Sequence, residues 1–508
     1  MPGFLDDRER NVIPRWRDFL STVHLGELNA GISAKIDVPP LFDLTSIAAD
    51  WELHRSASFA GDLISAAVVG GNLPAAREAA EFVVTLSEGV SLQLRTLAQR
   101  VLTGNPRTFP GPVMSLDTKG GRGARRSPEI SLAKRRLSDY PSDAVLWMDL
   151  AYLYAVRGLS RKAERCTRIA LNLAPRNRFI LRSSARFFVH VGRADIAHDL
   201  IRRSPGYKED PWLLAAEVSV ALAAKRTPWS TRESFSILNA AKFGPHHVSE
   251  LSSALGTLEF NSGNASKAKK LLRRSLQKPN DNSLAQAKWI WRQVWGMPAD
   301  FNVDEFKIDR PFEAAAFEAL GQSDWNRAFS SARLWLVDEP FSSDPARLGS
   351  YVAATVFEDF ARAEALAAFG LIANPDDAGL HIDLAFSYAS TGRREEAYKE
   401  LSKIGTSESE DWLGAAIEAN YGLLAFRGGY VEAGRKHYEA AVREADLIAD
   451  KRTKLTALVY WATEELALPD SNSVRLLAEA LETNKAASGY FNKFLLQRLA
   501  ERVSKRFG

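Results

Sequence analysis

The 508-residue chain contains a single cysteine, Cys166, which excludes an intrachain disulfide. Cys166 falls between Ala163 and Ala170 on the apolar face of an expected helix, so we expect a buried, unreactive thiol. No run reaches the ~18 uncharged apolar residues that span a bilayer, and the start of the chain lacks the apolar stretch of a secretory signal. These absences predict a cytoplasmic protein that makes no membrane contact.

Patterns that carry catalysis or metal binding are also lacking. The eight histidines are scattered, and the motifs H-E-x-x-H, C-x-x-C and G-x-S-x-G do not occur. Paired carboxylates such as Asp376 and Asp377 fall at expected helix starts, where a favourable interaction with the helix dipole explains them. The sequence therefore predicts that the protein is not an enzyme and has no cofactor and no metal site.

What the sequence does contain is a helical repeat with a period of about 34 residues. Its clearest copy matches the pattern W-x2-L-G-x2-Y, then small residues in a second helix, then proline, with Trp147, Leu150, Ala151, Tyr154, Ala163, Ala170 and Pro175. The small residue of the second helix recurs at Ala197, and the C-terminal half keeps the same spacing with Ala328, Ala363 and Ala397. Repetition at this period is typical of stacked helical hairpins.

These motifs resemble the tetratricopeptide-repeat superfamily over roughly residues 55–90 and 140–450. The resemblance implies an all-α fold, an α-solenoid of stacked antiparallel helix hairpins that acts as a scaffold for protein–protein interaction. Glycines such as Gly158 and Gly192 would close the hairpin turns with a positive φ. The first helix of each hairpin would line a concave groove.

Two stretches without a helical period divide the chain: residues 105–128 are rich in Pro, Gly and Arg, and residues 296–311 interrupt the repeats again. We expect an N-terminal helical module with one hairpin (1–104), a basic loop (105–128), a basic solenoid (129–295), an irregular break (296–311), an acidic solenoid (312–450) and C-terminal capping helices (451–508). In the first module, Trp16, Phe19, Leu20 and Leu28 suggest one or two capping helices.

The net charge of +4 conceals a strong asymmetry along the chain. Residues 119–208 carry 20 Lys and Arg against 7 Asp and Glu, whereas residues 300–450 carry 14 against 28. Opposite fields of this kind steer encounters with two different ligands, or with a second copy of the chain. The alternative is that the helices simply solvate their outer faces with these charges.

Several side chains are expected to line the concave groove. In the basic half, Tyr152 would lie beside Arg182 and Arg186, which are four residues apart on one helical face. These arginines could bind a carboxylate, a phosphate or an acidic peptide, or could instead pair with acidic neighbours. In the acidic half, the same face would carry Glu313, Phe317, Ile382 and Phe386. Such an apolar, acidic-edged groove suits a basic amphipathic helix or an extended peptide of a partner protein.

The densest basic patch comprises Lys119, Arg122, Arg125, Arg126, Lys134, Arg135 and Arg136. A patch of this kind neutralises phosphates, so a nucleic-acid-binding or regulatory subunit that uses residues 119–208 is the alternative function. The patch lacks the aromatic side chains that stack on exposed bases, and a solvated linker is the other explanation.

Overall fold

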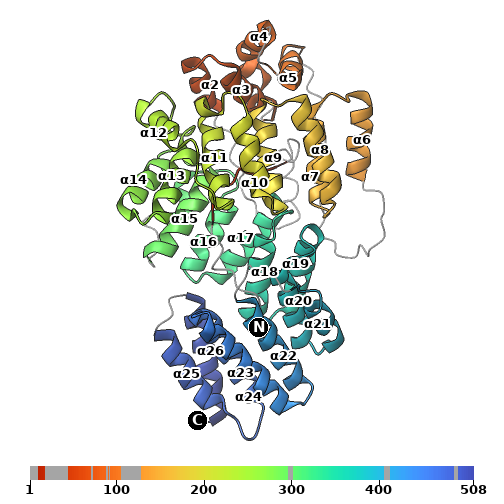
Figure 1. Cartoon of the computed structure of the whole chain (residues 1–508), viewed down its shortest axis with the longest axis vertical. Helices are drawn as coiled ribbons and strands as arrows, with labels where there is room; N and C mark the ends of the chain where they lie inside the picture. Colours follow the sequence, from red (N-terminus) through yellow and green to blue (C-terminus); the bar gives the residue numbers. More distant parts are fainter. Residues whose placement is uncertain are drawn as a thin grey trace. The chain divides into compact units, whose positions relative to one another are not determined.

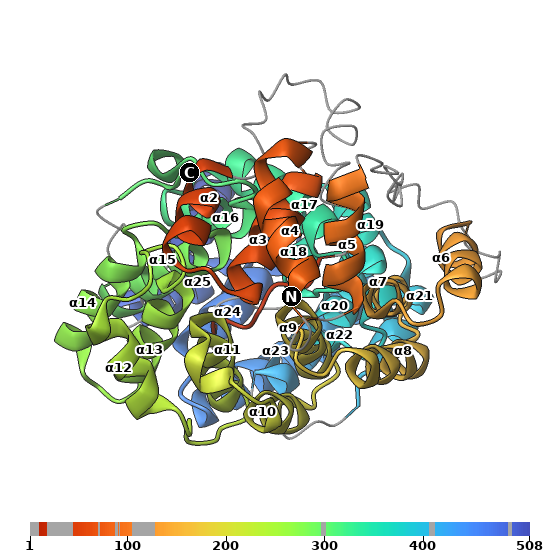
Figure 2. The same ribbon diagram turned by 90° about the horizontal axis from the view of Figure 1, so that it is seen from above.

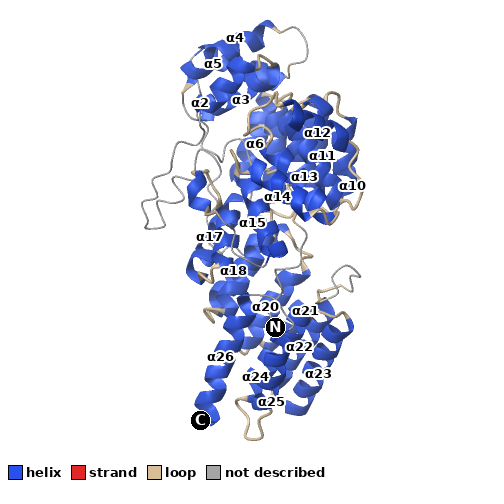
Figure 3. Cartoon of the chain, turned by 90° about the vertical axis from the view of Figure 1, so that its left-hand side faces the viewer, coloured by secondary structure: helices blue, strands red, loops and turns tan. Residues whose placement is uncertain are grey.

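The structure is a computed structural model that describes residues 10–17, 44–69, 72–86, 90, 92–103, 128–295, 301–405, 412–485 and 490–507. Within these residues it contains α-helices, short 3-10 turns and no strand (Figure 3). The chain divides into two compact units, which are described separately. We call them the N-terminal unit (Glu9–Ile290 and Phe301–Ala314) and the C-terminal unit (Met1–Arg8, Trp291–Asp300 and Ala315–Gly508).

The N-terminal unit is a succession of antiparallel helix pairs (Figures 1 and 2). The pairs are built from α2 (Leu44–Leu53), α3 (Ala57–Val69), α4 (Arg77–Thr85), α5 (Leu92–Thr103), α6 (Pro128–Asp139), α7 (Ala144–Ala155), α8 (Ser160–Leu173), α9 (Arg178–His190), α10 (Ala194–Arg203), α11 (Pro211–Ala223), α12 (Thr231–Ala240), α13 (Ser249–Asn261), α14 (Ala265–Ser275) and α15 (Asp281–Trp295), with 3-10 turns η2 (Leu73–Ala76), η3 (Tyr207–Glu209) and η4 (Val303–Phe306). The first helices α7, α9, α11 and α13 pack on one another in order. Gln286 of α15 donates to Thr257 of α13, so α15 lies next to α13. We call the face formed by α7, α9, α11, α13 and α15 the inner face.

The C-terminal unit repeats this arrangement. Its helices are α16 (Phe312–Gly321, whose first three residues belong to the N-terminal unit), α17 (Trp325–Asp338), α18 (Asp344–Thr355), α19 (Phe360–Ala373), α20 (Ala378–Ser390), α21 (Arg394–Leu401), α22 (Leu413–Arg427), α23 (Val431–Leu447), α24 (Lys451–Glu465), α25 (Ser473–Lys485) and α26 (Tyr490–Phe507). Helix α26 packs on α24 and α25. It also reaches back to the end of α18, where Arg498 donates hydrogen bonds to the carbonyls of Thr355 and Val356, both at 2.6 Å.

Local sequence explains where the hairpins begin and turn. Asp143 caps α7, because its carboxylate accepts hydrogen bonds from the amides of Val145 and Leu146 at 3.0 and 3.1 Å. The turns after α7 and α9 contain Gly158 and Gly192 with φ of 68° and 74°, a conformation that costs glycine little. The expected all-α solenoid of stacked hairpins is confirmed.

The predictions for the N-terminal module, the 105–128 loop and Cys166 have different outcomes. Trp16 does not lie in a capping helix, because residues 10–17 have no regular secondary structure. Pro14 accounts for this, since proline lacks an N–H donor and disfavours helical geometry in the residue before it. Phe19, Leu20 and Leu28, and nearly all of the expected loop 105–128, lie outside the described residues. Cys166 is buried, as expected.

Candidate functional site

Residues 10–17, here called the N-terminal segment, lie against the inner face of the N-terminal unit without regular secondary structure, and the Ile13 amide donates to the Asn11 carbonyl at 2.7 Å in a tight turn. The Trp16 side chain is fully buried, and that of Val12 is only 1% exposed. The Trp16 ring meets Tyr152 of α7 edge to face with centroids 5.3 Å apart, and Phe187 of α9 with centroids 5.9 Å apart. Aromatic pairs in this geometry add to the stabilisation that burial already supplies. Trp16 is therefore the apolar anchor of the segment.

Two side-chain amides of α15 hold the main chain of the segment. Asn282 donates to the carbonyl of Ile13 at 2.9 Å, and Gln286 donates to the carbonyl of Arg10 at 2.7 Å. The two amides lie four residues apart, so they project from the same face of the helix. Because every residue carries a carbonyl, these bonds fix the path of a bound chain without selecting its sequence.

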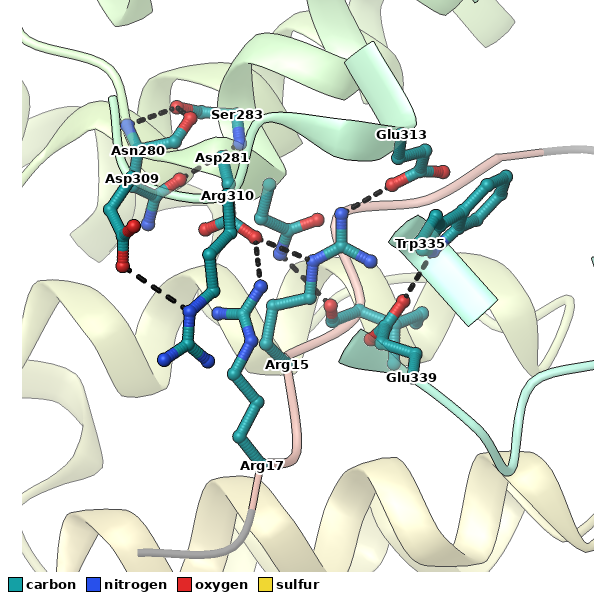
Figure 4. Close-up of polar contacts among 12 residues, drawn as sticks. Arg15, Arg17, Asn280, Asp281, Ser283, Asp309, Arg310, Glu313, Trp335 and Glu339 are labelled. Atoms are coloured by element: carbon teal, nitrogen blue, oxygen red, sulfur yellow. Dashed lines mark hydrogen bonds and ion pairs between the residues drawn. The ribbon is translucent and has the colours of Figure 1, made fainter. Parts of the chain in front are cut away.

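Two carboxylates receive the arginines of the segment. Arg10 binds Glu313 with both prongs of its guanidinium, at 2.8 and 2.7 Å. Arg15 also contacts Glu313, and it shares Asp281 with Arg17, at 3.1 and 2.7 Å respectively. Figure 4 shows Arg15 and Arg17 leaving the N-terminal segment and converging on Asp281. Forked pairs of this kind are among the strongest polar contacts that proteins make.

The protonation of these carboxylates is controlled by the arginines. Burial alone would raise the pKa of Asp281, but the charges of Arg17 and Arg15 outweigh it and lower the pKa to about 2. Burial likewise opposes the ionisation of Glu313, and the charges of Arg10 and Arg15 lower its pKa to about 2. Both side chains are therefore anions over the physiological range, and they create a buried acidic site for cations.

A second layer of polar side chains supports this site. Arg182 of α9 donates to the buried carboxylate of Glu250 at 2.8 Å, and Asn280 donates to the other oxygen of that carboxylate at 2.9 Å. Gln286 donates a second hydrogen bond to Thr257 of α13 at 3.0 Å. The bond to Thr257 fixes the side-chain amide of Gln286 in the orientation that meets the segment.

The residues predicted in the basic half have different roles in the structure. Tyr152 contacts the N-terminal segment directly. Arg182 pairs with Glu250, so the alternative of an acidic neighbour within the chain holds for it. Arg186 is half-buried, and burial together with the Arg186 charge lowers the pKa of His190 to about 4.

The groove predicted in the acidic half is not open in the structure. Ile382 is fully buried and Phe386 is 3% exposed, and the Phe386 ring lies 5.1 Å from that of Tyr460. Phe317 is half-buried and meets Trp335 edge to face at 6.0 Å. The chain's own side chains cover these apolar groups, so Ile382 and Phe386 offer no free docking surface. Glu313, which we expected beside them, belongs to the N-terminal unit and binds arginines there.

The predicted basic patch is described only in part. Lys119, Arg122, Arg125 and Arg126 lie outside the described residues, whereas Lys134 and Arg135 are exposed on α6 and Arg136 is half-buried. Among the residues that the structure describes, no three metal-ligating side chains come together. Nor does this part of the chain include a helix with the length and apolar character needed to cross a membrane.

Reasoning from the sequence missed the N-terminal segment and the α15 residues that hold it. A usable signal was present: Arg10, Pro14, Arg15, Trp16 and Arg17 combine cations, an aromatic ring and a helix breaker within a few residues. This composition is typical of a recognition segment without helical structure. The acceptors Asp281 and Glu313 could not be paired with it, because only the fold brings them together.

No protein-family model and no curated protein matches the chain. Solved structures that it resembles include the human IFIT1 dimer with PPP-AAAA (12% identity, 93% of this chain and 96% of that chain covered, TM-score 0.33), the APC/C hetero-tetramer Cut9-Hcn1 (12% identity, 90% and 92% covered, TM-score 0.40) and yeast Tom70 (13% identity, 74% and 92% covered, TM-score 0.31). At these identities and TM-scores the likeness says nothing about what this chain binds.

Proposed function

We propose that the chain is a non-enzymatic scaffold or adaptor that binds partner proteins as a subunit of a larger complex. In this proposal the inner face of the N-terminal unit holds a non-helical segment of the partner. The helical-repeat fold supports the scaffold role, because stacked repeats create long continuous surfaces suited to binding other chains.

One observation carries the proposal: Asn282 and Gln286 bind the main-chain carbonyls of a non-helical segment at 2.9 and 2.7 Å. Recognition of extended chains generally relies on main-chain hydrogen bonds for affinity and on side-chain pockets for specificity. The inner face supplies both, because the Trp16 pocket and two carboxylates flank the amides.

A protein partner is favoured over nucleic acid at this face. Asp281 and Glu313 accept hydrogen bonds from arginines in the structure, and a phosphate anion cannot replace those donors. The nucleic-acid alternative rests on residues 119–208, where Lys134 and Arg135 of the basic patch are exposed on α6 and Arg136 is half-buried.

An array of short peptides of varied composition tests the proposal. The probe is the full chain with Trp16→Ala, which removes the buried anchor of the chain's own segment. We expect this chain to retain a subset of the peptides, and we expect Asn282→Ala with Gln286→Ala to lose them. The matched control is Gln277→Ala, which removes an exposed amide just before α15. Circular dichroism verifies that each variant keeps its helices.

Two results would contradict the proposal. The first is a folded Trp16→Ala chain that retains no peptide. The second is a set of retained peptides that the Asn282→Ala and Gln286→Ala substitutions leave unchanged, because binding would then occur elsewhere on the chain.

A further inference from the structure

We infer that the inner face selects a partner segment built like the chain's own N-terminal segment: a non-helical peptide with arginine, four residues, then arginine-tryptophan-arginine. The segment is then an internal copy of the partner's recognition sequence, and it competes with the partner for the site. This inference rests on the proposed function and names the class of peptide that the site takes.

The positions of the contacts define this pattern. Arg10 and Arg15 both reach Glu313, while Arg15 and Arg17 both reach Asp281. The two carboxylates are therefore spaced to receive cations separated as they are in the segment. Trp16 lies between Arg15 and Arg17 in sequence, and its ring packs against the rings of Tyr152 and Phe187. The ion pairs and the aromatic contacts thus recognise neighbouring residues of the same segment.

Arginine fits this site better than lysine does. Arg10 donates to Glu313 through Nε and Nη2, to Gln286 through Nη1 at 2.6 Å and to Asn282 through Nη2 at 3.1 Å. A lysine ammonium is a compact charge without the planar fork that makes these bonds simultaneously. The Arg10 position therefore discriminates between the two cations as well as against neutral and acidic side chains.

The site discriminates against other classes of ligand through its buried charge. Asp281 and Glu313 are 12% and 7% exposed at their side chains. An acidic peptide or a nucleic acid brings no cation to pair with these carboxyl groups, and leaving them buried without a partner is unfavourable. The side-chain amides of Asn282 and Gln286 could still bind the main chain of an acidic peptide. Such a peptide would lack the cations that pair with Asp281 and Glu313.

Because the N-terminal segment belongs to the same chain, it competes at an effective concentration on the order of a millimolar. A free peptide of the same sequence then binds the wild-type chain weakly. Weakening the chain's own segment frees the site, and a partner that displaces the segment must bind more tightly than the segment does.

A fluorescently labelled peptide of residues 8–17 tests the inference by anisotropy. The proteins are the wild-type full chain, the full chain with Trp16→Ala, and the latter with Asp281→Asn and Glu313→Gln added. We expect Trp16→Ala to bind the peptide at least about tenfold more tightly than wild type, and the added substitutions to lose at least about tenfold, as expected for buried ion pairs. Two further peptides serve as controls: a scramble of identical composition, and a version with every arginine replaced by lysine.

The possible results separate the inference from the proposed function. Tight binding of the native peptide with weaker binding of both control peptides supports the inference. Equal binding of the scramble overturns the sequence class, while binding of unrelated array peptides would leave the proposed function standing. A folded Trp16→Ala chain that binds neither this peptide nor any array peptide overturns both the inference and the proposed function. The N-terminal segment would then serve only to stabilise the fold. If Trp16→Ala does not fold, Arg10→Gln with Arg17→Gln weakens the segment with its tryptophan intact, and the same criteria apply.

Discussion

The guanidinium of Arg10 forms a two-pronged ion pair with Glu313, at 2.8 and 2.7 Å, across a separation of 303 residues in the chain. This pair joins one end of the N-terminal unit's sequence to the other. Since Arg15 also contacts Glu313, a single carboxylate holds two cations of the segment. The retention of the N-terminal segment should therefore depend strongly on this one side chain.

We predict that Glu313→Gln releases the N-terminal segment from the inner face. A cysteine placed at Val12, which is 1% exposed, reports the release through its rate of reaction with a thiol reagent. We expect this rate to rise by at least about a hundredfold, because removing one partner of a buried pair costs about 3–5 kcal/mol and about 1.4 kcal/mol corresponds to a factor of ten.

The matched control for this experiment is Glu305→Gln, which changes an exposed carboxylate in η4. The native thiol adds little background, because burial raises the pKa of Cys166 to about 11. Equal labelling rates in the Glu313→Gln and Glu305→Gln chains would contradict the assignment of Glu313 as the holding carboxylate.

We predict that the contribution of Asp281 and Glu313 to the free energy of unfolding does not change between pH 5 and pH 8. The pKa values of Asp281 and Glu313 are about 2 in the folded chain, below the ordinary values of 3.8 and 4.5. A lowered carboxylate pKa contributes stability that is complete above the ordinary pKa and is lost as the pH falls towards the folded value. The difference in free energy of unfolding between the wild-type chain and the chain with Asp281→Asn and Glu313→Gln, measured by urea denaturation from pH 8 down to pH 3, should stay constant to about pH 5 and decline only below it. A decline near pH 6.5 would instead indicate that a histidine controls the site.

Much of the fold could be predicted from the sequence, because helical hairpins are specified locally. Ala151 and Ala163 are fully buried, as their repeat positions require. Gly158 adopts a positive φ as expected, but Ala449 adopts one too, with φ of 56° and no glycine to announce the turn. A local pattern thus predicts turns only where the sequence supplies the residue that suits them.

The candidate site was less predictable, because it is made by contacts between distant residues. Tyr152 was expected in the groove of the basic half, where it contacts the segment, but Glu313 was expected in the groove of the acidic half and instead belongs to the N-terminal unit. That the N-terminal segment occupies the inner face was not predictable, because residues 10–17 do not share the helical period from which the repeats were recognised. Ile382 and Phe386 show the opposite limit: their apolar character suggested a docking groove, whereas other parts of the C-terminal unit bury them.

We predict that Ala449→Gly stabilises helix α23, whereas Gly429→Ala destabilises helix α22. Both residues follow the last turn of a helix, and both adopt a positive φ, 56° for Ala449 and 80° for Gly429. The side chain makes this conformation unfavourable by roughly 1–2 kcal/mol, of which the greater unfolded-state freedom of glycine cancels a part. We expect changes of about 0.5–1 kcal/mol in opposite directions, measured by hydrogen exchange of amides in α22 and α23. Changes of the same sign would contradict this explanation.

We predict that Arg498→Ala detaches α26 from the rest of the C-terminal unit. The Arg498 guanidinium donates to the carbonyls of Thr355 and Val356, both at 2.6 Å, and to Glu358 at 3.1 Å. Hydrogen bonds to a charged group contribute about 1.5–3 kcal/mol, so hydrogen exchange of α26 amides should accelerate by about tenfold or more. Lys505→Ala, at an exposed position of the same helix, is the control and should leave exchange unchanged. If α26 exchanged at the wild-type rate in Arg498→Ala, its other contacts would hold it, namely its packing on α24 and α25, the Arg502–Glu358 ion pair and the contact of Phe494 with Trp325, and Arg498 would be dispensable.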